Sequence, residues 1–226
     1  MLASVTPFVS LSAFVLLLLV SLSVPIIKSL FLFRLTADAT NLYGVADAKG
    51  SATFGVWGYC VSAIDISIAA ISQTSTSAEC TDPKLGYTFD STIAEALHVE
   101  QYADLINKGS AAALVLHPIA CGLAFLTFLS SLFILCRGTG RMPSLCTLGI
   151  GLVAAILTTI AFLIDVIVVA IIRHRVNDET DGQLQLTWGN AVWMVLGATV
   201  ALWLGIVGSC CGICACGRHR HKGGRY

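Results

Sequence analysis

Long apolar runs alternate with polar segments along this chain of 226 residues. Four stretches contain no Asp, Glu, Lys or Arg: Met1 to Ile27, Ser110 to Cys136, Met142 to Ile164 and Leu184 to Gly217. A helix needs about 20 apolar residues to cross a hydrocarbon core of about 30 Å, and each stretch is long enough. Helices of soluble proteins instead carry one apolar and one polar face. The pattern therefore predicts a membrane protein with four transmembrane helices.

These runs divide the whole chain into predicted segments. We expect transmembrane helices at 7–33, 111–136, 144–172 and 188–210, an extracellular lobe at 34–110, a cytosolic turn at 137–143, a short extracellular loop at 173–187 and a cytosolic Cys-rich basic tail at 211–226. The first run is too long for a signal peptide and lacks its basic start, so a retained helix is favoured. Pro25 is expected to kink or end the regular part of that helix, because proline has no backbone N–H to donate.

The long polar segment after the first run is predicted to fold as a small lobe. Thr53 to Val61 mixes β-branched and aromatic residues, which is typical of a strand, and Leu85 to Phe89 is a candidate second strand. Thr92 to Glu95 has the form of a capping box, which predicts the start of a short helix. The predicted fold is an all-α transmembrane four-helix bundle with a small extracellular β-sheet lobe. A mostly irregular loop is the alternative for the lobe.

Cysteine placement helps to orient the chain. The long polar segment contains only Cys60 and Cys80, an even pair that suits an oxidising compartment. We expect these two residues to form a disulfide, which would constrain the unfolded chain by about 3 kcal/mol. Basic residues are slightly more frequent beside the predicted turn and tail than on the opposite side, which favours a cytosolic location for both termini.

Composition argues against several classes of function. Charged residues make up 12% of the chain, about half the usual fraction in a soluble domain, and the formal net charge is zero. A nucleic-acid partner is therefore not expected, because there is no basic footprint. The histidines form no catalytic arrangement with Ser or Cys, and the glycines form no phosphate-binding loop. We expect no enzyme activity, cofactor, metal site or small-molecule substrate.

A motif in the predicted lobe resembles a known family. Its residues are Gly55, Trp57, Gly58, Tyr59 and Cys60, followed later by Cys80. Further matching segments are Leu22 to Ile26, Leu85 to Tyr87, Leu116 to Ala120, Ala161 to Val166 and Gly189 to Trp193. In this order they resemble the fungal PalI family of pH-response regulators, which are claudin-like four-span membrane proteins related to an eisosome-associated sister family. The gap between the two cysteines is long for the claudin pattern.

The resemblance implies a function. It implies a non-enzymatic plasma-membrane accessory protein of ambient (alkaline) pH signalling, which assists a multi-span membrane pH sensor and is enriched at growing cell tips and division sites. A cortical-domain organiser, as in the eisosome-associated sister family, is the alternative, and a channel or transporter subunit is a further one. Membrane lipid is an expected partner, and a homo-oligomer stays open.

Two ionisable residues lie inside predicted spans. Asp165 is costly there, because a carboxylate in a spanning helix costs about 2.5 to 3.5 kcal/mol on insertion scales. His117 and Asp165 lie at a similar predicted depth, roughly 9 to 10 Å below the outer ends of their helices at 1.5 Å per residue. They are therefore a candidate intramembrane polar pair. A structural hydrogen bond and proton sensing both remain as interpretations of it.

The last predicted span and the tail carry two further features. Gly197, Ala201, Gly205 and Ser209 repeat every four residues, which predicts a ridge that another helix can approach closely. That helix belongs either to the same bundle or to a second copy of the chain. Candidate palmitoylation sites near the basic tail are Cys210, Cys211, Cys214 and Cys216. A zinc site and unmodified thiols are the alternatives for these cysteines.

Overall fold

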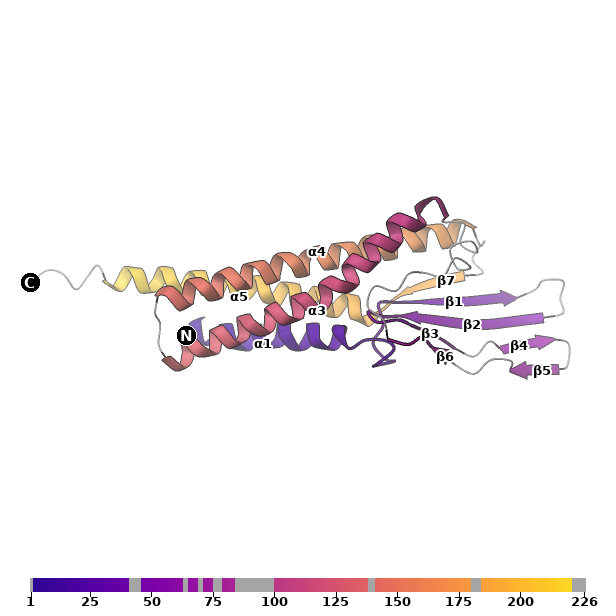
Figure 1. Ribbon diagram of the computed structural model, residues 1–226, viewed down its shortest axis with the longest axis horizontal. Helices are drawn as coiled ribbons and strands as arrows, with labels where there is room; N and C mark the ends of the chain where they lie inside the picture. Colours follow the sequence, from indigo (N-terminus) through magenta and orange to yellow (C-terminus); the bar gives the residue numbers. More distant parts are fainter. Residues whose placement is uncertain are drawn as a thin grey trace, which may run out of the picture. The chain divides into compact units, whose positions relative to one another are not determined.

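The computed structural model describes residues 2–40, 46–62, 65–68, 71–74, 79–83, 100–137, 141–179 and 184–220 (Figure 1). Its helices are α1 (Leu2–Ser21), α3 (Glu100–Arg137), α4 (Arg141–Glu179) and α5 (Asn190–Arg220). Its strands are β1 (Phe33–Thr40), β2 (Ala46–Phe54), β3 (Tyr59–Val61), β4 (Asp65–Ile68), β5 (Ile71–Thr74), β6 (Glu79–Cys80) and β7 (Leu184–Trp188). The chain divides into two compact units.

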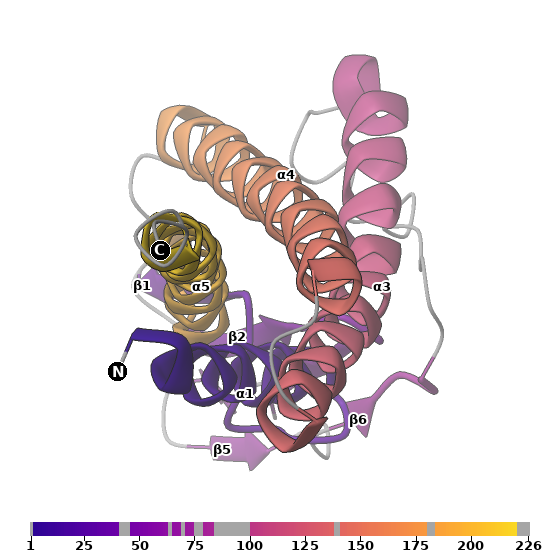
Figure 2. The same ribbon diagram turned by 90° about the vertical axis from the view of Figure 1, so that its left-hand side faces the viewer.

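The first unit is a helical bundle made of Met1–Leu18, Leu116–Ile160 and Met194–Tyr226. Parts of all four helices run alongside one another in it (Figures 1 and 2). Its core is rich in small side chains, and the buried residues are Ala13, Leu17, Ala120, Cys121, Ala124, Ala154, Ala155, Ala198 and Leu202. Small side chains let helix backbones approach closely, which is how helices associate when there is no hydrophobic effect between them. The outward-facing apolar side chains are suited to lipid.

The second unit contains the antiparallel sheet and comprises Leu19–Val115 and Ala161–Trp193. The main strand order is β5-β4-β2-β1-β7, and β3 pairs with both β2 and β6. Phe33 of β1 lies opposite Phe54 of β2 on one side and opposite Trp188 of β7 on the other. Strands from both polar connections therefore share one sheet.

Among the described residues, three helices are long and apolar enough to cross a membrane. The apolar segments are Leu114–Ile134, Leu145–His174 and Asn190–Cys210, and they coincide with the last three predicted spans. The apolar part of α1 among the described side chains, Thr6–Ser21, is shorter. The first predicted span, at 7–33, therefore stays a prediction.

Several predicted boundaries were wrong. The first helix was predicted to reach residue 33, but α1 ends at Ser21 and the chain then turns before β1. Pro25 lies in that turn, where a residue without a backbone N–H is tolerated better than in a helix. The other three helices extend beyond their predicted ends, because polar residues continue a helix where the apolar run has stopped.

The lobe predictions were partly right. An antiparallel sheet is present, but the predicted strand at Thr53 to Val61 is divided into the end of β2 and β3 by a tight turn. The predicted loop at 173–187 contains the end of α4 and most of β7 instead. The candidate strand at Leu85 to Phe89 and the capping box at Thr92 lie outside the described residues.

Candidate functional site

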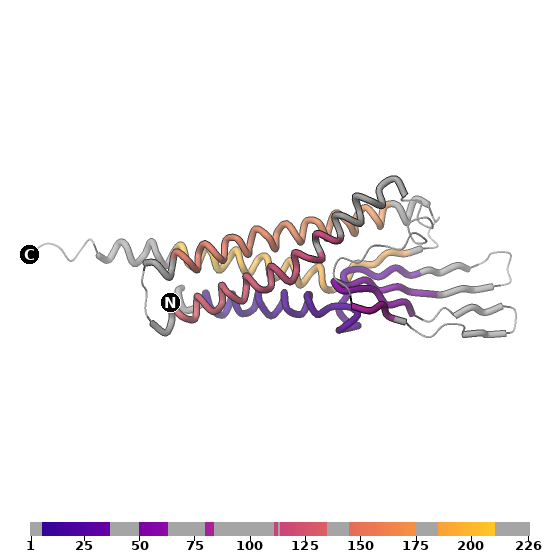
Figure 3. Tube along the Cα trace, in the orientation of Figure 1, coloured from indigo at the N-terminus to yellow at the C-terminus, as the bar shows by residue number. Residues whose placement is uncertain are grey.

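The family-like motif lies at the base of the sheet, against the segment that leaves α1. We call this region the junction and define it as residues 21–33, 54–60 and 189–191. In it the chain turns back on itself after α1, beside the ends of β1 and β2 (Figure 3). Backbone hydrogen bonds hold the turn closed: Ser23 N to Val20 O (3.0 Å), Ile26 N to Ser23 O (3.2 Å), Ile27 N to Leu22 O (3.1 Å) and Val24 N to Leu30 O (3.0 Å). The non-helical backbone therefore satisfies many of its own polar groups.

The motif residues bind this turn mainly through the backbone. The amide of Val56 donates to the Ser23 hydroxyl at 3.0 Å, and the amide of Trp57 donates to the Val24 carbonyl at 3.3 Å. The Trp57 indole Nε1 donates to the carbonyl of Ser21, which is the last residue of α1. Since the last carbonyls of a helix have no partner within it, the indole satisfies one of them. Trp57 thus connects the β2–β3 turn to the end of α1.

Glycine is required where backbones meet in the junction. A Cβ atom at Gly55 would lie 2.5 Å from the Val24 carbonyl oxygen and 2.7 Å from the Val24 Cβ atom. A Cβ atom at Gly58 would collide with the Thr81 hydroxyl, and one at Gly189 would collide with the carbonyls of Phe31 and Leu32. A larger residue at Gly55 or Gly189 would force these backbones apart, and one at Gly58 would displace the Thr81 hydroxyl.

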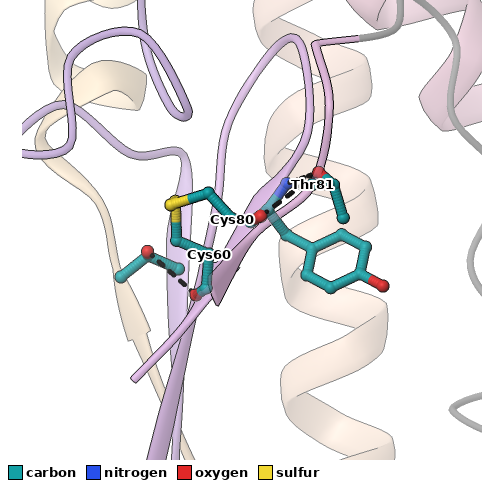
Figure 4. Close-up of a disulfide and its surroundings, with 5 residues drawn as sticks. Cys60, Cys80 and Thr81 are labelled. Carbon is teal, nitrogen blue, oxygen red and sulfur yellow. Dashed lines mark hydrogen bonds between the residues drawn. A yellow bond between two sulfur atoms is a disulfide. The ribbon is translucent and has the colours of Figure 1, made fainter. Parts of the chain in front are cut away.

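The predicted disulfide between Cys60 and Cys80 is confirmed (Figure 4). The two residues lie opposite each other in β3 and β6, with their Cα atoms 4.0 Å apart. Next to the disulfide, the Tyr59 amide donates to the Thr81 hydroxyl at 3.1 Å, and the Thr81 amide donates to the Tyr59 carbonyl at 3.0 Å. The disulfide and Thr81 therefore hold the short strand β6 against the motif.

The start of α5 completes the junction. The Asn190 side chain accepts a hydrogen bond from the Phe31 amide at 3.2 Å and donates one to the Ser29 carbonyl at 3.0 Å. The amides of Gly189 and Ala191 donate to the carbonyls of Leu32 (2.8 Å) and Phe31 (3.2 Å). The first turn of α5 is thereby bound to the segment that follows α1.

A model of the SUR7/PalI family matches residues 2–205 of the chain. The chain belongs to the SUR7/PalI family. The resemblance found in the sequence is therefore confirmed, and the matched region includes every residue of the junction. A comparison with curated proteins finds no match. Together with its three long apolar helices, membership identifies the chain as a membrane protein of the SUR7/PalI family.

Both predicted intramembrane ionisable residues of this SUR7/PalI protein are buried. His117 is 1% exposed and Asp165 is 6% exposed. His117 belongs to the bundle unit and Asp165 to the sheet-containing unit, so their pairing stays a prediction.

The small-residue ridge of α5 faces other helices of the bundle unit. A Cβ atom at Gly197 would lie 3.4 Å from the Leu16 side chain of α1. Ala201, Gly205 and Ser209 line a cavity that residues of α1, α3 and α4 also line. These contacts are those of a ridge that packs within one bundle, and homodimerisation through it stays a prediction.

The tail cysteines are described only in part. Cys210 is exposed near the end of the apolar part of α5, as an acylated residue would have to be. Helix α5 continues through Cys211, Cys214 and Cys216, whose side chains lie outside the described ones. Acylation of these cysteines stays a prediction.

Three contacts in and beside the junction were not predicted, although two of the residues that make them, Ser23 and Asn190, lie in segments that carry the family resemblance. Ser23, Thr81 and Asn190 each provide a side-chain hydrogen bond in this region. Asn190 had a usable signal, since an Asn directly before an apolar run is typical of a helix start. Nothing in the sequence signals the contacts of Ser23 and Thr81, because a single hydroxyl does not indicate its partner.

Proposed function

We propose that this protein is a non-enzymatic accessory component of ambient (alkaline) pH signalling at the plasma membrane, where it assists a multi-span membrane sensor through direct contact. It would be a claudin-like four-span protein with both termini in the cytosol and the sheet outside. Family membership over residues 2–205 is the observation that carries the proposal.

The junction supports a role in contact rather than turnover. Its polar groups are used for hydrogen bonds between segments of the chain, such as the Val56 amide to Ser23 and the Asn190 side chain to Ser29. The result is a sheet bound firmly to the end of α1 and the start of α5. A firmly held lobe is suited to presenting a fixed surface to a partner, because little ordering cost remains for binding.

Deletion of the gene in the organism that encodes this protein, followed by growth at alkaline pH, tests the proposal. We expect poor alkaline growth, with loss of signal-dependent processing in the pathway and less sensor at the cell surface. A wild-type copy should restore all three. Normal alkaline growth with a normal amount of sensor at the surface would reject the role.

Two glycine variants test whether the function depends on the junction rather than on the bundle. Gly55→Val should fail to restore alkaline growth, because its side chain has no space beside Val24. Gly149→Val is the matched control, since a Cβ atom there meets nothing within 4 Å. Equal rescue by the two variants, at equal membrane levels, would show that the junction is not needed.

A cortical-domain organiser is the second candidate, favoured because the matching family includes SUR7 proteins as well as PalI proteins. Such a protein would assemble into static patches, whereas an accessory of a sensor would give a diffuse or tip-enriched surface signal. Time-lapse imaging of a tagged copy at its native level distinguishes the two.

A further inference from the structure

A small cavity inside the bundle unit is lined by hydroxyl groups. Its volume is about 20 Å³, and all four helices contribute to its wall. The hydroxyl-bearing residues are Thr6 and Ser10 of α1, Thr127 of α3, Thr147 of α4 and Ser209 of α5. Such a convergence is unusual among helices that are otherwise apolar, because a buried hydroxyl without a hydrogen bond costs free energy.

Three of these five residues are buried, and Thr6 and Ser209 are half-buried. Ser10, Thr127 and Thr147 are 3%, 6% and 5% exposed. Thr127 and Thr147 also lie within segments long and apolar enough to cross a membrane. In such surroundings each polar atom must find its partner inside the protein or in a trapped molecule.

Three of these hydroxyls use their protons within their own helices. The bonds run from Ser10 Oγ to Pro7 O (3.0 Å), from Thr127 Oγ1 to Leu123 O (2.8 Å) and from Ser209 Oγ to Gly205 O (2.8 Å). A hydroxyl that has donated its proton still has lone pairs to accept hydrogen bonds. The cavity wall therefore presents acceptors, and the complementary occupant is a hydrogen-bond donor.

Size and charge decide which donor fits. A single water needs about 10–15 Å³ of such volume and two to four polar partners, and the cavity provides both. A bare cation would also suit oxygen lone pairs, but burying an unpaired charge costs tens of kcal/mol in an apolar medium. No Asp or Glu is found among the described residues that line the cavity, so nothing there offsets that cost. An acyl chain has no donor to offer.

We propose that this cavity is a binding site for one ordered water molecule, which donates hydrogen bonds to hydroxyl oxygens from different helices. A direct bond such as Ser10 to Ser131, at 3.3 Å, joins only two helices. A water has two protons to donate, so it likewise joins two of the helices α1, α3, α4 and α5 at a time, without requiring their backbones to touch. The polar residues in these spans thereby serve bundle cohesion.

Solid-state NMR of the full chain in liposomes tests the water site. With threonine methyl groups labelled, magnetisation is transferred from water protons to the protein and its build-up is followed. We expect a several-fold faster build-up at Thr127 and Thr147 than at Thr158. Thr158 is the matched control because it is 0% exposed, donates to Ala154 O at 2.7 Å and does not line the cavity.

Shape-preserving variants test the role of the hydroxyls. Thr147→Val should abolish the fast build-up at Thr127, and Thr127→Val should abolish it at Thr147, while Thr158 stays unchanged. The unchanged Thr158 signal also shows that each variant is folded. Three results would overturn the proposal: build-up as slow at Thr127 and Thr147 as at Thr158, transfer from lipid acyl protons in place of water, or fast build-up that persists in both variants.

Discussion

At the scale of single residues, the junction depends on glycines, which have no side chain, as much as on polar side chains. Gly55, Gly58 and Gly189 each lie where another segment leaves no space for a Cβ atom. Trp57 and Asn190 then use polar atoms to bind the segments that the glycines allow to approach. Close backbone approach and side-chain hydrogen bonds therefore depend on each other.

Gly55→Ala should lower the stability of the protein. Its methyl group would collide with the Val24 backbone, which cannot move as a flexible side-chain end can, and overpacking of this kind costs about 1–3 kcal/mol. Thermal unfolding in detergent should show a lower midpoint. Gly122→Ala is the control, because a Cβ atom there meets nothing within 4 Å and alanine favours a helix over glycine by about 1 kcal/mol. A midpoint for Gly55→Ala at or above that of Gly122→Ala would contradict the packing argument.

Trp57→Phe should destabilise the protein through one lost hydrogen bond. Phenylalanine keeps an aromatic ring but cannot donate to the Ser21 carbonyl, and such a loss costs about 0.5–1.5 kcal/mol. Trp193→Phe provides the comparison, since Trp193 is 62% exposed. The midpoints of thermal unfolding of the two variants should differ clearly. Identical midpoints would mean that the indole bond contributes nothing.

At the scale of helices and strands, the elements end where their polar groups find partners in other elements. The carbonyl at the end of α1 accepts from Trp57, and the first residue of α5 binds Phe31 and Ser29. Strand β6 has only two residues and is held by its disulfide and by Thr81. The end of α1, the start of α5 and strand β6 are thus each stabilised by contacts with a neighbouring segment.

Asn190 variants should give a graded loss of stability. Asn190→Asp keeps an acceptor for the Phe31 amide but cannot donate to Ser29, whereas Asn190→Ala loses both bonds. We expect Asn190→Ala to cost about 1 kcal/mol, the usual cost of losing a polar side chain at a helix start, and Asn190→Asp to cost less. Chemical unfolding in detergent measures the order, and the reverse order would count against the proposed bonds.

Removal of the disulfide should destabilise the lobe. Cys60 and Cys80 are separated by 20 positions, and closing a loop of that size constrains the unfolded chain by about 3 kcal/mol. The double variant Cys60→Ala/Cys80→Ala should be cleaved by protease in the lobe at lower temperature. Cys146→Ala is the control, since Cys146 is a free, exposed cysteine. Equal protease resistance of the two variants would mean that the disulfide contributes little.

The sequence predicts an element well when the residues of that element determine it, and poorly when contacts with distant residues determine it. The apolar segments of α3, α4 and α5 were predicted well, because each is a long apolar run that can be recognised from its own residues. The end of α1 was predicted too late, at residue 33, although Pro25 was expected to kink or end its regular part. Residues 22–33 are nearly as apolar as a span, and their turn is held by local bonds such as Val24 N to Leu30 O and by bonds to the distant residues Phe54 and Trp57. Strand β7 was missed for the same reason, since its partner β1 is far away in the sequence.

The features of the candidate site also fall into those that the sequence predicts and those that only the fold reveals. The Gly–Trp–Cys motif and the disulfide were found, since they rest on rare residue types at defined positions. The contacts of Ser23 and Thr81 were not, because only the fold brings them to Val56 and Tyr59. The burial of His117 and Asp165 agrees with the high cost of an ionisable side chain that faces lipid.

At the scale of the whole molecule, the proposed topology places the sheet outside the cell and both termini inside. Asp82 is exposed beside β6, so a cysteine at that position should react with a membrane-impermeant maleimide on intact cells. A carboxy-terminal tag should be reached by antibody only after permeabilisation. The reverse pattern for both probes would invert the topology.

The pairing of β7 with β1 also has a consequence for biosynthesis. Strand β1 can pair with β2 as soon as both have been made, but its other edge must wait until residues 184–188 emerge from the ribosome, after α3 and α4. Contacts between such distant segments form late, because a long loop must close first. The nascent protein therefore carries an open strand edge during most of its synthesis. Chains truncated before β7 should be retained and degraded by quality control.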